Sequence, residues 1–270
     1  FKLDKSAVDR RINWLIEAGM KLHLNCEIGK DIAASKLEED FDAIYLGIGA
    51  TAGRYAGIDG EKASNVYLAM DLLTGIQRRN LGTDCEYIDV KDKNVVVIGG
   101  GDTAMDCVRT SVREKAKSVK CLYRRDEANM PGSKKEVVNA KEEGVEYVFN
   151  VSPKSVVVDN EIATGVELLT TSMSEPDESG RQRVVINEGS EYIEEADVVI
   201  MALGFSPEVP SFLKDLNVDT NSWGGIETTS YQTSNAKVYA GGDCQRGAHL
   251  AVTAAADGRE AAKTIIKALS

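Results

Sequence analysis

The stretch NVVVIGGGDTAMDC, residues 94–107, decides the fold of this chain. Its apolar run VVVI is typical of a strand that is buried on both faces, as strands of parallel sheets are. The residues that follow fit the pattern G-x-G-x-x-A with Gly99, Gly101 and Ala104. In this pattern the first glycine allows the turn out of the strand, the second lets a diphosphate approach the backbone, and the small third residue lets helix and strand pack closely. The stretch therefore predicts a dinucleotide-binding turn, with a bare packing turn as the alternative.

A helix is expected directly after the glycines, from Thr103 to about Lys115, because its apolar residues recur with helical spacing. The amino terminus of such a helix offers unpaired N–H groups and a partial positive charge to a phosphate. Asp102 and Thr103 lie at this terminus, and the residues leave open whether they cap the helix or contact the cofactor. Asp106 and Arg109 are expected on the helix surface.

The end of the next strand indicates which nucleotide is bound. An NAD site usually has an acidic residue there, which accepts hydrogen bonds from the ribose hydroxyls. In this chain the strand ends in Arg124 and Arg125, whose guanidinium groups are suited to a phosphate. This favours NADP(H), which carries a 2′-phosphate, and Lys134 is expected to add positive charge. The alternative is a solvated strand end at which the two arginines pair with Asp126 and Glu127.

Composition limits the class of protein. The chain has 270 residues, of which 43% are hydrophobic and 28% charged, and its net charge is −11. This negative charge argues against nucleic acid as the main partner, and no apolar run is long enough for a membrane span. The five cysteines are scattered without metal-ligand spacing, which favours buried, reduced thiols, a cytoplasmic location and no metal centre.

The order of expected elements predicts an α/β protein with a right-handed, doubly wound parallel sheet. Helices are expected at 8–18 (closed by Gly19), near 68–78, at 134–144 and at 249–269, and strands at 21–28, 41–50, 118–126, 145–151, 196–207 and 237–244. From about residue 154 short strands and turns predict an antiparallel meander, with a polar hairpin tip at 173–182.

A second nucleotide site is suggested by AGGD, residues 240–243, at the end of an apolar strand and just before the last helix. An aspartate in this place is able to bond a chain of hydroxyl groups, and the helix start is able to face an electron-rich group. The alternative is a turn in which Asp243 is only a local cap. The residues alone do not separate these two interpretations.

Five stretches carry a resemblance to a known family: GGGDTAMDC, CLYRRDEANMPGSKKEVVNAKEEGVEY, ALGF, AGGD and HLAVTAAADGREAA. They resemble the small (beta) subunit of NADPH-dependent glutamate synthase and, more widely, the flavoprotein reductases that bind two dinucleotides. The resemblance covers nearly the whole chain, and is loose only at 51–90 and 172–192. It implies FAD contacts at Gly242 and Asp243, with Ala251 and Val252 at the end of a helix that faces the flavin, and it includes Gly204 of ALGF among the cofactor-binding residues.

The resemblance also implies two Rossmann-like domains, one inserted into the other. An NADP(H) domain at 86–207 would interrupt an FAD domain made of 1–85 and 208–270, with the crossings at LGIGA and ALGF. Family members begin with a cysteine-rich iron–sulfur segment and a first glycine fingerprint for FAD, and neither is matched in this sequence. On that ground we expect a carboxy-terminal fragment that is inactive on its own and binds FAD poorly or not at all.

The activity implied by the resemblance is hydride transfer from NADPH to FAD. Electrons would then pass through iron–sulfur clusters to a glutamate synthase large (alpha) subunit, which makes glutamate from glutamine and 2-oxoglutarate. No catalytic residue is expected in this chain, because the cofactors carry the chemistry. The alternatives are a flavoprotein subunit of another NADP-linked electron-transfer complex, such as a ferredoxin:NADP or sulfide-linked reductase, and a non-catalytic NADP-binding module.

Overall fold

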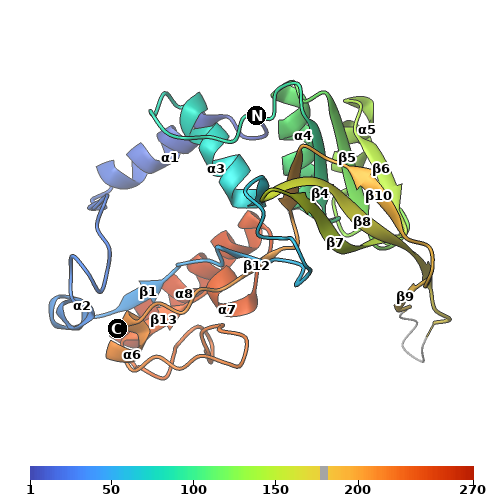
Figure 1. Ribbon diagram of the computed structural model, residues 1–270. Helices are drawn as coiled ribbons and strands as arrows, with labels where there is room; N and C mark the ends of the chain where they lie inside the picture. The colour runs from blue at the N-terminus through green and yellow to red at the C-terminus, as the bar shows by residue number, and fades with distance from the viewer. Residues whose placement is uncertain (177–181) are drawn as a thin grey trace. The chain divides into compact units, whose positions relative to one another are not determined.

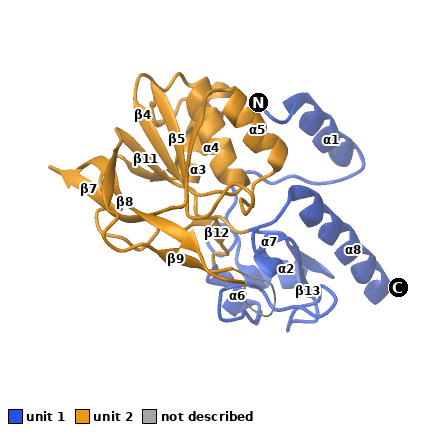
Figure 2. Cartoon of the chain, turned by 90° about the vertical axis from the view of Figure 1, so that its right-hand side faces the viewer, with its two compact units in different colours: residues 1–49, 209–270 blue, residues 50–208 orange. Residues whose placement is uncertain are grey.

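The computed structural model describes residues 1–176 and 182–270. The chain forms two compact units, one made of residues 1–49 and 209–270 and the other of residues 50–208 (Figure 2). The predicted second boundary, at 208, agrees with this division. The predicted first boundary, at 85, does not, because residues 50–85 pack into the unit that contains the glycine loop.

The larger unit is built on a five-stranded parallel sheet with the strand order β3-β11-β4-β5-β6 (Figure 1). Every neighbouring pair in it is parallel. The strands are β3 (Val66–Leu68), β11 (Val198–Met201), β4 (Asn94–Ile98), β5 (Ser118–Tyr123) and β6 (Glu146–Phe149). Residues 50–85 belong to this unit because they include β3, which pairs with β11 at the edge of the sheet.

Side chains of β4 alternate between two cores, as the period of a strand requires. Val95 and Val97 face the helices α3 (Ala69–Asn80), α4 (Asp102–Arg113) and α5 (Lys134–Glu142). Val96 and Ile98 face a core shared with β7 (Val151–Asp159) and β8 (Ile162–Met173). The α/β class is therefore confirmed, and the second face of the parallel sheet is covered by antiparallel strands instead of helices.

The predicted antiparallel meander is formed by β7, β8, β9 (Val184–Ile186) and β10 (Tyr192–Glu195), in which β8 pairs with the other three. The predicted hairpin tip at 173–182 includes residues 177–181, which lie outside the described residues. On either side of them the Ser174 N–H donates to the Arg183 carbonyl at 2.8 Å.

Two short strands lie just inside the larger unit, one near its first residue and one near its last. β2 (Ala52–Gly53) and β12 (Phe205–Ser206) pair antiparallel, with Phe205 opposite Gly53 and Ser206 opposite Ala52. The Thr51 hydroxyl also donates to the Glu208 carboxylate at 2.9 Å. The segments that enter and leave the larger unit are thus bonded to each other.

The smaller unit contains a parallel pair, β1 (Ile44–Leu46) and β13 (Val238–Ala240). Its helices include α2 (Ala34–Asp40), α6 (Phe212–Asp215), α7 (Asp243–Arg246) and α8 (Ala251–Leu269). Its core is formed by residues of α2, α6 and the two strands, with Leu216 and Val238 fully buried. None of the helices in the described residues is both long and apolar enough to cross a membrane.

The first helix, α1 (Lys5–Glu17), forms as predicted, and Gly19 follows it with a positive φ of 104°. The strand predicted at 21–28 does not form. Leu22 and Leu24 are exposed, and within the described residues Ile28 makes only an isolated bridge to Ile32. Alternating apolar residues form a strand where a neighbouring strand supplies hydrogen bonds, and no strand of the described residues does so here.

Candidate functional site

The glycine loop lies at the carboxy end of β4, between the ends of β11 and β5. Gly99 has a φ of +149°, and a Cβ there would lie 2.2 Å from the carbonyl oxygen of Ala202. A Cβ on Gly100 would lie 2.4 Å from the ring of Tyr123. A Cβ on Gly101, in contrast, would meet nothing within 4 Å. The first two glycines are therefore required by the fold, whereas the third leaves its backbone open to a ligand.

The start of α4 has no side-chain cap. Gly101 is the N-cap residue, and within the described residues it offers no side-chain cap to the first turn. The Asp102 carboxylate accepts instead from the Ser133 N–H at 2.8 Å, and Thr103 lines a cleft above the loop. The capping interpretation of Asp102 and Thr103 is thus not what the structure shows, and the N–H groups at this helix start are left for another acceptor.

The cleft has a volume of about 640 Å³, which is within the range of ~300–1000 Å³ typical of small-molecule sites. It lies over the carboxy ends of β11, β4 and β5, entirely within the larger unit. Its lining includes the glycine loop, Gly204, both arginines of the β5 end and an apolar group made of Ile98, Leu122, Val151, Ala202 and Leu203.

Arg124 and Arg125 both line the cleft. Their backbones are held by two bonds, from the Thr171 hydroxyl to the Arg124 carbonyl at 2.9 Å and from the Asn150 N–H to the Arg125 carbonyl at 3.1 Å. The Arg125 Nε is buried and has no hydrogen-bond partner in the described part of the chain. A buried, unpaired donor of a charged group is costly, and an anion bound by the rest of this guanidinium in the cleft would offset part of that cost.

The alternative pairing of these arginines with Asp126 and Glu127 does not form. Asp126 accepts from the backbone and side-chain nitrogens of Asn129, and Glu127 pairs with Lys141 at 2.6 Å. The acidic residues next to the arginines are thus occupied by other partners. This leaves the positive charge of the β5 end available to the cleft.

The segment that follows the arginines is fastened to the glycine loop. The Gly132 N–H donates to the Gly100 carbonyl at 2.9 Å, and the Tyr123 hydroxyl donates to the Asn129 carbonyl at 3.0 Å. Asn129 and Pro131 form part of the cleft wall as a result. Lys134 is the exposed first residue of α5 and is not among the residues that line the cleft.

Arg109 is not on the helix surface as predicted, because its side chain is buried between α4 and α5. It donates to the carboxylates of Glu143 and Glu136 at distances down to 2.6 Å. The bonds to Glu143 raise the pKa of Arg109, and those to Arg109 lower the pKa of Glu143. Arg109 therefore joins α4, whose amino terminus lines the cleft, to α5.

The cysteines are partly as predicted. Cys107, Cys121 and Cys244 are buried, whereas Cys26 and Cys85 are only half-buried, and all five are free thiols. Burial raises the pKa of the Cys121 thiol to about 12. Its Sγ lies 3.2 Å from the Gly99 carbonyl, so it is a packing residue beneath the glycine loop. Within the described residues no group of three or more His, Cys, Asp or Glu side chains is placed to hold a metal ion.

The residues of the suggested second site lie in the smaller unit. Gly242 has a φ of +76°, and its N–H donates to the buried Asp257 at 3.0 Å. The Asp243 carboxylate accepts from the His249 N–H at 3.2 Å, which joins the AGGD turn to the start of α8. Ala251 and Val252 are the exposed first residues of α8, whose N-cap makes no side-chain bond. The structure thus brings these four predicted residues to one end of the unit.

Sequence analysis missed several residues of both regions. In the cleft they are Arg54, Tyr55, Asn129, Pro131, Ser152 and Pro153. Arg54 comes shortly after the strand predicted at 41–50, which ends in small residues. This position near the end of a strand could have indicated that Arg54 lies at a binding site. In the smaller unit the missed residue is Asp257, an acid in an alanine-rich helix, which also pairs with Arg246.

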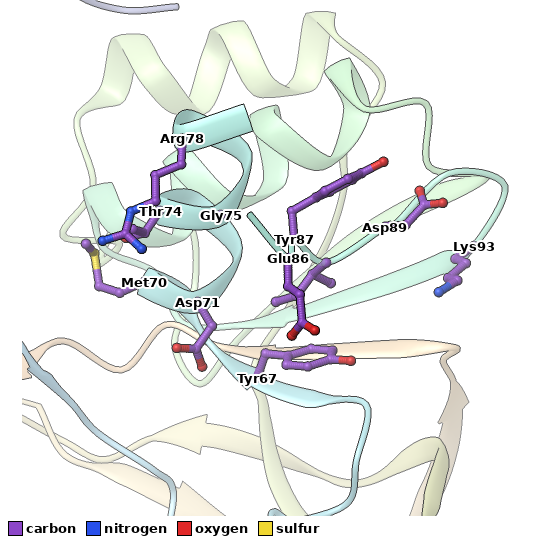
Figure 3. A pocket seen from close by; sticks show the side chains of 11 residues that line it. Tyr67, Met70, Asp71, Thr74, Gly75, Arg78, Glu86, Tyr87, Asp89 and Lys93 are labelled. Carbon is purple, nitrogen blue, oxygen red and sulfur yellow. The ribbon is translucent and has the colours of Figure 1, made fainter. Parts of the chain in front are cut away.

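A second cleft in the larger unit has a different character (Figure 3). It lies between α3 and the segment that precedes β4, and Figure 3 shows the carboxylates of Asp71 and Glu86 near Tyr67. Asp89 also lines it, and no part of the glycine loop does. Its lining carries three carboxylates and two cations, Arg78 and Lys93, so it offers a phosphate no excess of positive charge. The glycine-lined cleft is therefore the candidate for a dinucleotide.

The chain is similar to proteins whose names agree with the predicted resemblance. It is 46% identical to the glutamate synthase [NADPH] small chain of Escherichia coli, over 98% of this chain and 58% of that protein. It is 35% identical to the NADPH-Fe(3+) oxidoreductase subunit beta of Geobacter sulfurreducens, over 84% of this chain and 34% of that protein. The chain thus spans about half, or less, of the length of these relatives.

The fold agrees with a solved structure. Mycobacterium tuberculosis FprA in complex with NADPH superposes with a TM-score of 0.73 at 16% identity, over 91% of this chain and 67% of that one. This likeness supports the two-unit fold alone. Residues 9–258 match one family along most of the chain. The glycine loop, the parallel sheet and this match lead to one conclusion: the chain belongs to the pyridine nucleotide-disulphide oxidoreductase family.

Proposed function

We propose that this chain binds NADP(H) in the glycine-lined cleft and serves in an oxidoreductase that passes a hydride from NADPH to FAD. The observation that carries the proposal is the buried, unpaired Nε of Arg125 beside an uncapped helix start. The diphosphate would lie over Gly101 and the first turn of α4, a helix start without a side-chain cap in the described part of the chain. The 2′-phosphate would lie at Arg124 and Arg125, and Lys134, the exposed first residue of α5, would add positive charge from outside the cleft lining.

The residues of the second region fit a flavin in the proposed complete site. Gly242 and Asp243 would bond the ribityl or phosphate part of FAD, and Ala251 and Val252 would direct the start of α8 at the flavin ring. The missing side-chain cap of α8 supports this, because its first N–H groups have room for an outside acceptor. Asp257 would hold the backbone of Gly242 in place.

The chemistry supplied by the bound cofactors would be hydride transfer from nicotinamide to flavin. This chain would contribute binding and orientation. Its glycine loop fixes the diphosphate, its arginines select the phosphorylated ribose, and its apolar cleft residues exclude water from part of the ligand. No side chain of this chain is needed as an acid or base in that step, so we assign no catalytic residue.

The acceptor proposed first is a glutamate synthase large subunit, reached through iron–sulfur clusters of the whole protein, with glutamate made from glutamine and 2-oxoglutarate. The E. coli relative supports this choice by its name and its 46% identity. A second candidate is another NADP-linked electron-transfer complex, favoured by the G. sulfurreducens relative. A cytoplasmic location is proposed with either one.

Two measurements test this function. The first is the affinity of the purified protein for NADPH and NADH, where we expect NADPH to bind at least about tenfold more tightly, since one charge-assisted contact is worth about 1.5 kcal/mol or more. Equal affinities would contradict the proposed selectivity. The second is NADPH oxidation by the full-length protein with FAD, first with an artificial dye and then with a large subunit, glutamine and 2-oxoglutarate. Tight NADPH binding without dye reduction would instead support a non-catalytic binding module.

A further inference from the structure

Arg54 lies on the opposite side of the glycine loop from the two arginines of β5. Its N–H donates to the Gly204 carbonyl at 3.2 Å, which places it beside the exit of β11. In the sheet, β11 and β5 are the two neighbours of β4. The cleft therefore has a cationic residue at each end and the glycine loop between them.

The guanidinium of Arg54 is held at one atom and open at the others. Its Nε donates to the Ser206 hydroxyl at 2.8 Å, and this contact is supported by the pairing of β2 with β12. Among residues 1–176 and 182–270, no carboxylate pairs with this side chain. An arginine that is fixed by a neutral hydroxyl keeps its full charge and its terminal N–H donors for a ligand.

The order of the strands places Arg54 and the two arginines after β5 on opposite sides of the glycine loop. Adjacent strands lie about 4.8 Å apart, so the ends of β5 and β11 are separated by about 10 Å. With the adenosine end at β5 and the adenosine-side phosphate over the glycine loop after β4, the second phosphate of the diphosphate points toward β11, the side on which Arg54 lines the cleft. We propose that Arg54 binds the nicotinamide-side phosphate of NADP(H). This inference rests on the proposed function and assigns a further binding residue to that site.

A purely structural role for Arg54 makes a different prediction. If the side chain only joined β2 to β12, its removal would lower stability and weaken every ligand of the cleft alike. A contact to the nicotinamide-side phosphate affects only ligands that contain this phosphate. Adenosine 2′,5′-bisphosphate lacks it but keeps the 2′-phosphate and the adenosine, so it separates the two roles.

The experiment measures the affinities of NADPH, NADH and adenosine 2′,5′-bisphosphate for the purified protein by calorimetry. In Arg54→Ala we expect NADPH and NADH to bind about tenfold more weakly or worse, and the bisphosphate to bind as in the wild type. Arg54→Lys should recover part of the lost affinity, since lysine restores the positive charge but not the paired N–H donors of a guanidinium. Arg78→Ala is the matched control, because Arg78 is an exposed arginine that lines the other cleft.

Three results would overturn the inference. The first is unchanged NADPH affinity in Arg54→Ala, and the second is an equal loss for the bisphosphate, which would move Arg54 to the adenosine end or to a structural role. The third is a loss of the same size in Arg78→Ala, which would show a general effect of charge. If the wild type bound NADPH and the bisphosphate, and Arg54→Ala bound NADPH as tightly as the wild type, only this inference would fail and the proposed function would stand. If it bound none of the three ligands, the proposed function would fail as well.

Discussion

Replacing Arg125 with alanine should separate nucleotide recognition from folding. In the protein without nucleotide, the Nε of this residue is buried and unpaired. Such a donor costs about 1–3 kcal/mol, and the substitution removes that cost together with some packing of the side-chain stem. We therefore expect the nucleotide-free variant to unfold at the wild-type temperature or above it, which is unusual for a change at a half-buried residue.

The expected effect on binding has a definite size. A hydrogen bond between a guanidinium and a phosphate contributes about 1.5–3 kcal/mol, and each 1.4 kcal/mol is a tenfold change in affinity. Arg125→Ala should therefore weaken NADPH by about 10- to 150-fold. NADH has no 2′-phosphate, so its affinity should change by less than about threefold. Arg124→Ala should show the same selectivity, with a smaller effect because its side chain is exposed and screened.

The assay combines thermal unfolding without nucleotide and titration with both nucleotides at one ionic strength. Arg78→Ala again controls for the loss of one positive charge on this unit. An equal loss of NADPH and NADH affinity would refute the assignment of the 2′-phosphate. A clear fall in the unfolding temperature would refute the view that the Nε of Arg125 is unpaired until a ligand binds.

Three further predictions concern the loop, the ion pairs and the thiols. Gly101→Val should abolish binding of both nucleotides while the free energy of unfolding stays within about 0.5 kcal/mol, because its φ of −88° suits any residue and its Cβ would point into open space. Glu143→Gln should lower the free energy of unfolding at neutral pH by about 1.5–3 kcal/mol, since it removes charged bonds to Arg109. The pKa of Glu143 is lower in the folded chain than its ordinary 4.5, so this difference should be complete above pH 4.5 and shrink as the pH falls below it. In the native protein a thiol reagent should label two cysteines quickly and three slowly, the slow ones being Cys107, Cys121 and Cys244.

Each of these has a control and a contrary outcome. Gly99→Ala is the contrast to Gly101→Val, because its Cβ would clash with Ala202 and disrupt the loop. Wild-type nucleotide affinity in Gly101→Val would contradict the placement of the diphosphate at Gly101. For Glu143→Gln, denaturant unfolding from pH 7 down to pH 3 is the measurement, and a constant difference across this range would be contrary. For the thiols, fast labelling of Cys121 would show that the reagent reaches the core beneath the glycine loop, which would contradict the burial of this side chain.

Local signals were sufficient to predict the centre of the larger unit. The VVVI run, the glycines and the periodicity after Thr103 are contiguous, and each is explained by the local backbone: β4, the turn and α4 appear where they were expected. Gly99 and Gly101 were both identified, although the structure gives them different roles. Gly100, which the pattern does not specify, is required because the ring of Tyr123 covers it.

Long-range contacts set the limits of prediction. Arg109 was expected at the surface because its partners lie elsewhere in the sequence, Glu136 on α5 and Glu143 directly after it, and helix periodicity does not reveal a buried ion pair. The boundary at residue 85 was wrong because β3 is only three residues long and joins its sheet through a strand more than a hundred residues later. Arg54 was missed for the same reason, since the partner of its side chain, Ser206, is equally distant in sequence.

The central claim is that the arginines after β5 and the glycine loop hold the two ends of the adenosine half of NADP(H). A crystal structure of the protein with NADP⁺ tests it most directly. We predict that the 2′-phosphate lies within hydrogen-bond distance of Arg124 or Arg125 and that the diphosphate lies over residues 99–104. A complex in which the adenosine end lies elsewhere, for instance in the cleft beside α3, would contradict the account.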